Sequence, residues 1–251
     1  MQRTIAAVTA VLSFLSSAPS FAAPASPWPD TPLGRAQALA VIETLDARLL
    51  ASPSATATLE AWCGEHRMAS PPRLTAERVR GVDKPVTDEQ RRVLQVGQGE
   101  RVKYRRVRLS CGGHVLSEAD NWYVPGRLTA AMNHVLETTD TPFGRAVAGL
   151  HPVRQTLAAE LLWSPLPARW DLRVGRPPAV ADSSGGGALA IPDELFRHRA
   201  VLYGARRRPF SEVVETYSSE VLDYPRAPAS HEVAPAEEGG GGDGDGGEGQ
   251  G

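Results

Sequence analysis

Apolar and polar residues alternate through the middle of the chain, on either side of a pair of glycines. β-Branched and other apolar side chains alternate with polar ones from Lys103 to Cys111 and again as far as Val124, and Gly112 and Gly113 separate the two runs. Alternation with a period of two is typical of half-buried strands, and a glycine pair suits a tight turn. The pattern therefore predicts a β-hairpin.

Helical spacing begins directly after this hairpin. Pro125 and Gly126 end the second strand, since proline has no N–H to donate. The apolar residues that follow recur every three or four positions: Leu128, Met132, Val135 and Leu136. A second, short helix is expected to open at Pro142, after a cap offered by Thr139 and Asp140.

Two amphipathic helices are predicted in the N-terminal part of the chain. From Leu33, apolar residues recur every three or four positions, and this helix is expected to end near Ala51. Ser52-Pro53-Ser54 then begins a second helix, which places Leu59 and Trp62 on one face.

The region between the second helix and the hairpin is interpreted as a loop followed by a strand. Residues 68–83 are polar, contain prolines and show no clean period. The run from Arg91 to Val96 looks like a strand, and Gly97-Gln98-Gly99 is typical of a turn. Together with the hairpin, this strand would make a meander of three antiparallel strands.

The C-terminal part predicts further strands. Residues 154–163 fit a strand or a short helix, because periodicity does not distinguish the two at this length. Residues 164–190 are rich in proline and glycine and are interpreted as an insertion. The stretch from Leu195 to Leu222 predicts two strands around Gly204 to Pro209.

Both ends of the chain differ in composition from the middle. Residues 1–23 combine Arg3, an apolar run from Ile5 to Leu15 and small residues before Pro24, which is the layout of a cleaved secretory signal. That apolar run is too short to span a bilayer, so we expect a periplasmic or secreted protein with no stable membrane insertion after signal removal. Residues 24–32 read as a linker.

The other end, residues 226–251, is expected to be a disordered tail of glycine and acidic residues. It offers no large apolar side chains beyond a single valine, too little to offset the entropy cost of ordering. The remaining residues, 33–225, form one domain in this interpretation. The chain is 41% hydrophobic over 251 residues, which is enough to bury a core.

Charge and residue spacing argue against several classes of function. The formal net charge is -2, and an exported, slightly acidic chain is a poor match for nucleic acid despite its local basic patches. The histidines are scattered singly without metal-ligand spacing, so no metal site is predicted. Cys63 and Cys111 fit either one disulfide or two buried free thiols, and both readings stay open.

The hairpin and the turn after it also contain a motif. Its parts are Arg106 on the first strand, Gly112-Gly113-His114 at the turn, Val124-Pro125, and Thr141-Pro142-Phe143-Gly144-Arg145. This run resembles the chorismate lyase (chorismate pyruvate-lyase) family, whose fold is shared by the UTRA domains of some transcription regulators. The resemblance implies an α+β fold, in which helices pack on an antiparallel β-sheet, and it favours a strand for residues 154–163.

The resemblance also implies a reaction and its residues. Chorismate lyases remove pyruvate from chorismate, which leaves 4-hydroxybenzoate, and they use no cofactor. By position Arg106 would hold the substrate carboxylate, and Glu215, chosen over Glu212, would share a proton with the ether oxygen. Other positions that match the family's ligand pocket are Ala55, where a larger apolar side chain is usual, Phe143, Gly144 and Arg154.

Three hypotheses about function remain open at this point. One is an enzyme that eliminates pyruvate from chorismate or a similar enol ether. Another is an exported binding protein that holds a small aromatic or enol-ether carboxylate without turnover, which the export signal favours, as does Asp120-Asn121 in place of the family's Gly-Arg. A third is a protein whose cavity is filled by its own side chains. In each case we expect a monomer.

Overall fold

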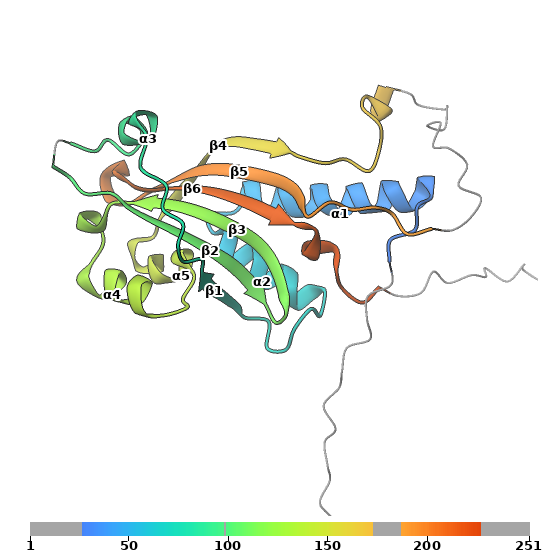
Figure 1. Cartoon of the computed structure of the whole chain (residues 1–251), viewed down its shortest axis with the longest axis horizontal. Helices are drawn as coiled ribbons and strands as arrows, with labels where there is room; N and C mark the ends of the chain where they lie inside the picture. The colour runs from blue at the N-terminus through green and yellow to red at the C-terminus, as the bar shows by residue number, and fades with distance from the viewer. Residues whose placement is uncertain (1–26, 98, 173–186, 227–251) are drawn as a thin grey trace, which may run out of the picture.

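The centre of the fold is an antiparallel sheet of six strands in the order β1-β2-β3-β6-β5-β4 (Figure 1). The computed structural model describes residues 27–97, 99–172 and 187–226. The strands are β1 (Leu74–Arg78), β2 (Lys103–Cys111), β3 (His114–Tyr123), β4 (Val153–Leu161), β5 (Glu194–Tyr203) and β6 (Pro209–Ser218). The predicted signal, most of the predicted tail and a large part of the predicted insertion lie outside the described residues.

Helices lie on one face and at one end of this sheet (Figure 1). They are α1 (Pro32–Ala51), α2 (Ala55–Glu65), α3 (Asp88–Val93), α4 (Ala130–Thr138) and α5 (Phe143–Ala146). Short 3₁₀ helices fill several connections: η1 (Pro125–Arg127), η2 (Ala148–Leu150), η3 (Trp170–Leu172), η4 (Ala205–Arg207) and η5 (Ser219–Leu222). The predicted α+β fold, with helices packed on an antiparallel sheet, is therefore confirmed.

One face of the sheet, which we call the inner face, packs against α1 and α2. Leu45 of α1 and Trp62 of α2 belong to the same buried cluster as Leu109 of β2 and Tyr217 of β6. Thr31 and Ser54 cap the two helices, since their hydroxyls accept hydrogen bonds from the backbone N–H of Gly34 and Ala57. This cluster forms the main hydrophobic core.

The opposite face, the outer face, is charged. Arg106 pairs there with Glu118, and Arg199 pairs with the buried Glu212 at 2.8 Å. The chain between β1 and α3 crosses this face (Figure 1), and the indole of Trp122 donates to the backbone oxygen of Lys84 at 3.0 Å.

Cys63 and Cys111 form a disulfide in the structure. The bond joins α2 to the end of β2, so it fixes the helix layer to the inner face. Of the two readings that the sequence left open, the structure has the disulfide.

The predicted elements are confirmed except between α2 and the hairpin. Residues 91–96 are not a strand, because Thr87 and Gln90 form a capping box that begins α3 in this region. The third strand of the predicted meander is instead β1, which pairs with β2 from Leu74 opposite Cys111 to Arg78 opposite Val107. β1 is only five residues long, and it lies in the stretch that was interpreted as a loop.

The described residues lack two further features. No helix in these parts of the chain has the length and apolar character needed to cross a membrane. Nor do three or more His, Cys, Asp or Glu side chains gather there in a way that could hold a metal ion.

Candidate ligand-binding site

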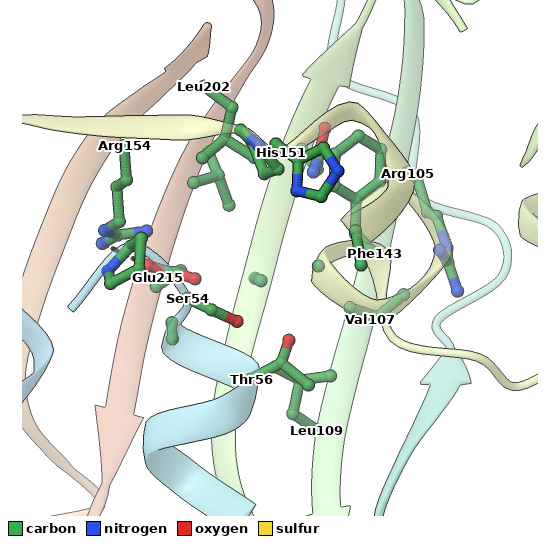
Figure 2. A pocket seen from close by; sticks show the side chains of 18 residues that line it. Ser54, Thr56, Arg105, Val107, Leu109, Phe143, His151, Arg154, Leu202 and Glu215 are labelled. Atoms are coloured by element: carbon green, nitrogen blue, oxygen red, sulfur yellow. Dashed lines mark hydrogen bonds and ion pairs between the residues drawn. The ribbon is translucent and has the colours of Figure 1, made fainter. Parts of the chain in front are cut away.

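A cavity of about 380 Å³ lies between the inner face of the sheet, the first turn of α2 and the short helix α5 (Figure 2). Its walls are largely apolar. The apolar lining includes Ala55, Val107, Leu109, Ala119, Phe143, Leu202 and Val213. The polar lining consists of Ser54, Thr56, Arg105, Asn121, His151, Arg154 and Glu215. Apolar walls with a few convergent polar groups are typical of small-molecule sites, and this volume is within their usual range.

A close contact between α2 and α5 forms one wall of the cavity. A side chain at Gly144 would place its Cβ 2.8 Å from Oγ1 of Thr56, so glycine is required for α5 to approach α2 this closely. Arg145 supports the same contact through an ion pair with Glu60 of α2 and a hydrogen bond to the backbone oxygen of Leu74. The motif from Thr141 to Arg145 thus builds the cavity wall.

A buried ion pair lies at one side of the cavity. Arg154 of β4 donates from Nη2 to Oε2 of Glu215 on β6 at 2.7 Å, and the hydroxyl of Tyr217 donates to the same oxygen at 3.2 Å. Burial by itself would lower the pKa of Arg154, but the charge of Glu215 raises it above its ordinary value. Burial and the Glu215 charge raise the pKa of Tyr217. Both side chains therefore hold Oε2 of Glu215 in place.

The other oxygen of Glu215 is available to the cavity. No group of the described residues donates a hydrogen bond to Oε1. This oxygen is also accessible to solvent. It can therefore accept a hydrogen bond from a ligand hydroxyl.

Arg105 lies on the other side of the cavity from Arg154 (Figure 2). It is only 3% exposed, and within the described part of the chain its one hydrogen bond runs from Nη2 to the backbone oxygen of Thr141 at 3.3 Å. Nε and Nη1 are buried without a partner among the described residues. Burial and the nearby charge of Arg78 lower the pKa of Arg105 to about 10, so it keeps its positive charge at neutral pH. A buried cation with two unused donors is costly, and an anion would remove that cost.

Asn121 and His151 complete the polar lining. Oδ1 of Asn121 accepts a hydrogen bond from Ser211 at 2.9 Å, which leaves the amide nitrogen free to donate. His151 follows η2 in a left-handed backbone conformation with φ of 47° and lines the cavity beside Pro152.

The structure corrects the placement of Arg106. It was expected at the ligand carboxylate, but it lies on the outer face, where it pairs with Glu118, and it does not line the cavity. Side chains of a strand alternate between the two faces, so Arg105 shares the inner face with Val107 and Leu109 while Arg106 points away. The sequence holds this signal, because the apolar positions 107, 109 and 111 are in phase with residue 105.

The other candidate residues meet in one place. Ala55, Phe143, Gly144, Arg154 and Glu215 all line the cavity, although they come from four different elements. Glu212, the alternative to Glu215, points to the outer face and pairs with Arg199. Sequence reasoning did not assign a role to Arg105, Asn121 or His151.

Comparison with known proteins gives one clear relative. No family model matches the chain. The uncharacterized protein y4mC of Sinorhizobium fredii (strain NBRC 101917 / NGR234) is 52% identical over 199 residues, which cover 79% of this chain and 82% of y4mC. The chain belongs to the y4mC family.

Solved structures that are similar to this chain include domains of transcription regulators. One is the ligand-binding domain of a protein described as a GntR-family transcriptional regulator from Bordetella bronchiseptica, with a TM-score of 0.37 and 16% identity, covering 62% of this chain and 88% of that one. Another is the effector domain of PhnF from Mycobacterium smegmatis, with a TM-score of 0.39 and 15% identity, covering 67% and 90%. Likeness of this degree does not identify a ligand or an activity.

Proposed function

We propose that this protein binds a small aromatic carboxylate in the cavity between α2, α5 and the sheet. The observation that supports this most directly is Arg105, a buried guanidinium with two unused donors on an otherwise apolar wall. A guanidinium pairs strongly with a carboxylate. Nε and Nη1 lie on different edges of the guanidinium and are sealed from solvent, so a ligand carboxylate would reach one of them, and only after the Arg105 side chain turns toward the cavity.

The opposite side of the cavity suits the other end of such a ligand. Oε1 of Glu215 would accept a hydrogen bond from a ligand hydroxyl there, while Arg154 and Tyr217 donate hydrogen bonds to Oε2. Between the two polar ends, Val107, Leu109 and Val213 offer apolar surface to a flat ring. 4-Hydroxybenzoate has this combination of groups, and it is also the product that the resemblance to chorismate lyases implies.

The binding test compares two adjacent arginines. We expect isothermal titration of the full chain with 4-hydroxybenzoate to show binding that Arg105→Gln weakens by about 10-fold to 100-fold, because a charge-assisted hydrogen bond contributes about 1.5–3 kcal/mol. Arg106→Gln is the matched control on the outer face and is expected to leave the affinity within about twofold. Equal loss in both variants, or no binding by the wild type, would contradict the proposal.

Pyruvate elimination from chorismate is the second candidate function, and the free Oε1 of Glu215 favours it. A carboxylate oxygen open to the cavity can take part in proton movement at an ether oxygen. The same proteins are incubated with chorismate while pyruvate is measured. Pyruvate formation that Glu215→Gln abolishes would make the protein a lyase, whereas binding of 4-hydroxybenzoate without pyruvate would leave a binding protein.

We propose export to an oxidising compartment for either function. The Cys63–Cys111 disulfide supports this location, since such bonds persist mainly outside the cytoplasm. The signal-like pattern of residues 1–23 gives independent support.

A further inference from the structure

The cavity between α2, α5 and the sheet is larger than a single aromatic ring requires. Its volume is about 380 Å³, whereas an engineered apolar cavity of about 150 Å³ is enough to bind benzene. The carboxylate and hydroxyl of 4-hydroxybenzoate add little to the volume of its ring, so this acid would fill only part of the cavity. A ligand that fills a cavity makes more close contacts with its walls than one that leaves gaps.

A small side chain on the sheet leaves part of this room. Ala119 of β3 lies directly opposite Val107 of β2 and directly opposite Glu215 of β6. Residues that are paired in this way point to the same face of a sheet, and all three line the cavity. Ala119 therefore forms a hollow in the sheet wall, between two longer side chains.

The walls around this hollow are held in place, so the cavity does not close around a smaller ligand. β3 is hydrogen-bonded to β2 on one side and to β6 on the other, which fixes the sheet wall. On the helix side, the hydroxyl of Ser54 accepts from the N–H of Ala57, and the backbone oxygen of Ser54 accepts from that of Thr58. α5 already touches α2, where a Cβ at Gly144 would lie 2.8 Å from Oγ1 of Thr56. The volume is therefore a fixed property of the fold.

In the part of the chain that the structure describes, the cavity has no buried cation left for a second acidic group on the ligand. Arg154 is paired with Glu215 on one side, and the proposed function assigns Arg105 on the other side to the ligand carboxylate (Figure 2). The remaining basic side chain of the described lining is that of His151, which is exposed, so water screens any charge that it carries. The other lining residues are apolar or uncharged. Ligand atoms beyond the first ring are therefore expected to be apolar.

We infer that the cavity takes an aromatic acid with two fused rings, and that Ala119 sets the limit on ligand size. This inference rests on the proposed function, because it keeps the same carboxylate and hydroxyl contacts and adds a second ring. The second ring would fill the hollow over Ala119 and transfer more apolar surface from water to the apolar walls. A fused pair of rings is also rigid, so it loses little conformational entropy when it binds. Ala119 is thus a specificity-determining residue.

The first test compares acids of different size on the wild-type full chain by isothermal titration. 4-Hydroxy-1-naphthoate adds a second ring beside that of 4-hydroxybenzoate, and 6-hydroxy-2-naphthoate adds it along the axis of the molecule. At least one of them is expected to bind about tenfold or more tightly than 4-hydroxybenzoate, because the second ring buries further apolar surface. If 4-hydroxybenzoate binds and neither naphthoate binds more tightly, the inference is wrong while the proposed function stands. If none of the three acids binds, both are wrong.

A charged analogue tests the apolar character of the space beyond the first ring. 4-Hydroxyisophthalate is 4-hydroxybenzoate with a second carboxylate, so it adds charge where the naphthoates add a ring. It is expected to bind about 10-fold to 100-fold more weakly than the tighter naphthoate, because burial of an unpaired carboxylate is costly. Binding of the dicarboxylate as tight as that of the naphthoate would overturn the inference.

Ala119→Val links the size preference to one residue. The larger side chain fills the hollow, so we expect it to weaken binding of the tighter naphthoate at least about tenfold more than binding of 4-hydroxybenzoate. Ala158→Val is the matched control, since Ala158 is exposed on β4 and lies outside the cavity lining, and the ratio of the two affinities should not change. Equal weakening of both acids by Ala119→Val would overturn the inference. The wild-type titrations remain decisive if Ala119→Val does not fold.

Discussion

The inner and outer faces of the sheet contain arginine and glutamate side chains on the same strands, yet these side chains differ in how fully they are paired. On the outer face Arg106 and Glu212 have partners of opposite charge, in Glu118 and Arg199. On the inner face Arg105 keeps two donors unused, and Glu215 keeps one oxygen open to the cavity. Charges on the outer face hold segments of the chain together, whereas two charged side chains on the inner face keep unused hydrogen-bonding groups, which the proposed function assigns to a ligand.

The largest expected effect contrasts the two glutamates of β6. Glu215→Ala leaves Arg154, whose side chain is 4% exposed, as an unpaired buried charge, so we expect a loss of about 3–5 kcal/mol in the free energy of unfolding. Glu212→Ala should cost less, about 1–2 kcal/mol, because Arg199 keeps Glu89 as a partner. Urea denaturation of both variants measures the difference. Equal losses would mean that the two faces are energetically alike.

The second contrast concerns the two arginines of β2. Arg105→Met removes a buried cation with unused donors and is expected to raise the free energy of unfolding by about 1–3 kcal/mol while it abolishes binding of 4-hydroxybenzoate. Arg106→Met removes a half-exposed ion pair and should lower stability by no more than about 1 kcal/mol without changing the affinity. Thermal unfolding measures the stability of each variant, and isothermal titration measures its affinity for 4-hydroxybenzoate. Destabilisation by Arg105→Met would contradict the prediction, because it would show that the guanidinium stabilises the fold.

A smaller effect should appear at high pH. Tyr217 has a raised pKa in the fold, so it keeps its proton while the unfolded chain loses its own above about pH 10. The stabilisation is therefore complete below pH 10 and is lost as the pH rises further, by at most about 1.4 kcal/mol per pH unit. In Tyr217→Phe the fall in stability between pH 10 and 11.5 should be shallower than in the wild type. The check is urea denaturation at each pH, and identical slopes would count against a buried, protonated Tyr217.

Local patterns in the sequence predicted most of the fold. The alternation of apolar and polar residues predicted both strands of the hairpin, and the helical spacing of apolar residues predicted α1 and α2. α3 was missed although Thr87 and Gln90 spell its capping box, because the run from Arg91 to Val96, which overlaps this helix, was interpreted as a strand. β1 could not be predicted from its own residues, since it is defined by pairing with β2 and by contacts from Glu60 and Arg145.

The candidate site was predicted less well, and for two reasons. Arg105 could have been found from the phase of the alternation, but the resemblance to a family directed attention to Arg106. The pairing of Arg154 with Glu215 joins residues 61 positions apart on strands that are not neighbours, so no local pattern reveals it. The gathering of Asn121 and His151 at the same cavity likewise follows from topology.

The Cys63–Cys111 bond has a consequence for the integrity of the chain. Together with the backbone it makes a covalent ring from two cysteines that are 48 positions apart in sequence, and this ring contains β1, α3 and nearly all of β2. A single proteolytic cut inside the ring releases no fragment, because both new ends stay attached through the sulfur bridge. In a compartment that contains proteases, this part of the protein can lose one peptide bond and still keep every strand of its sheet within one molecule.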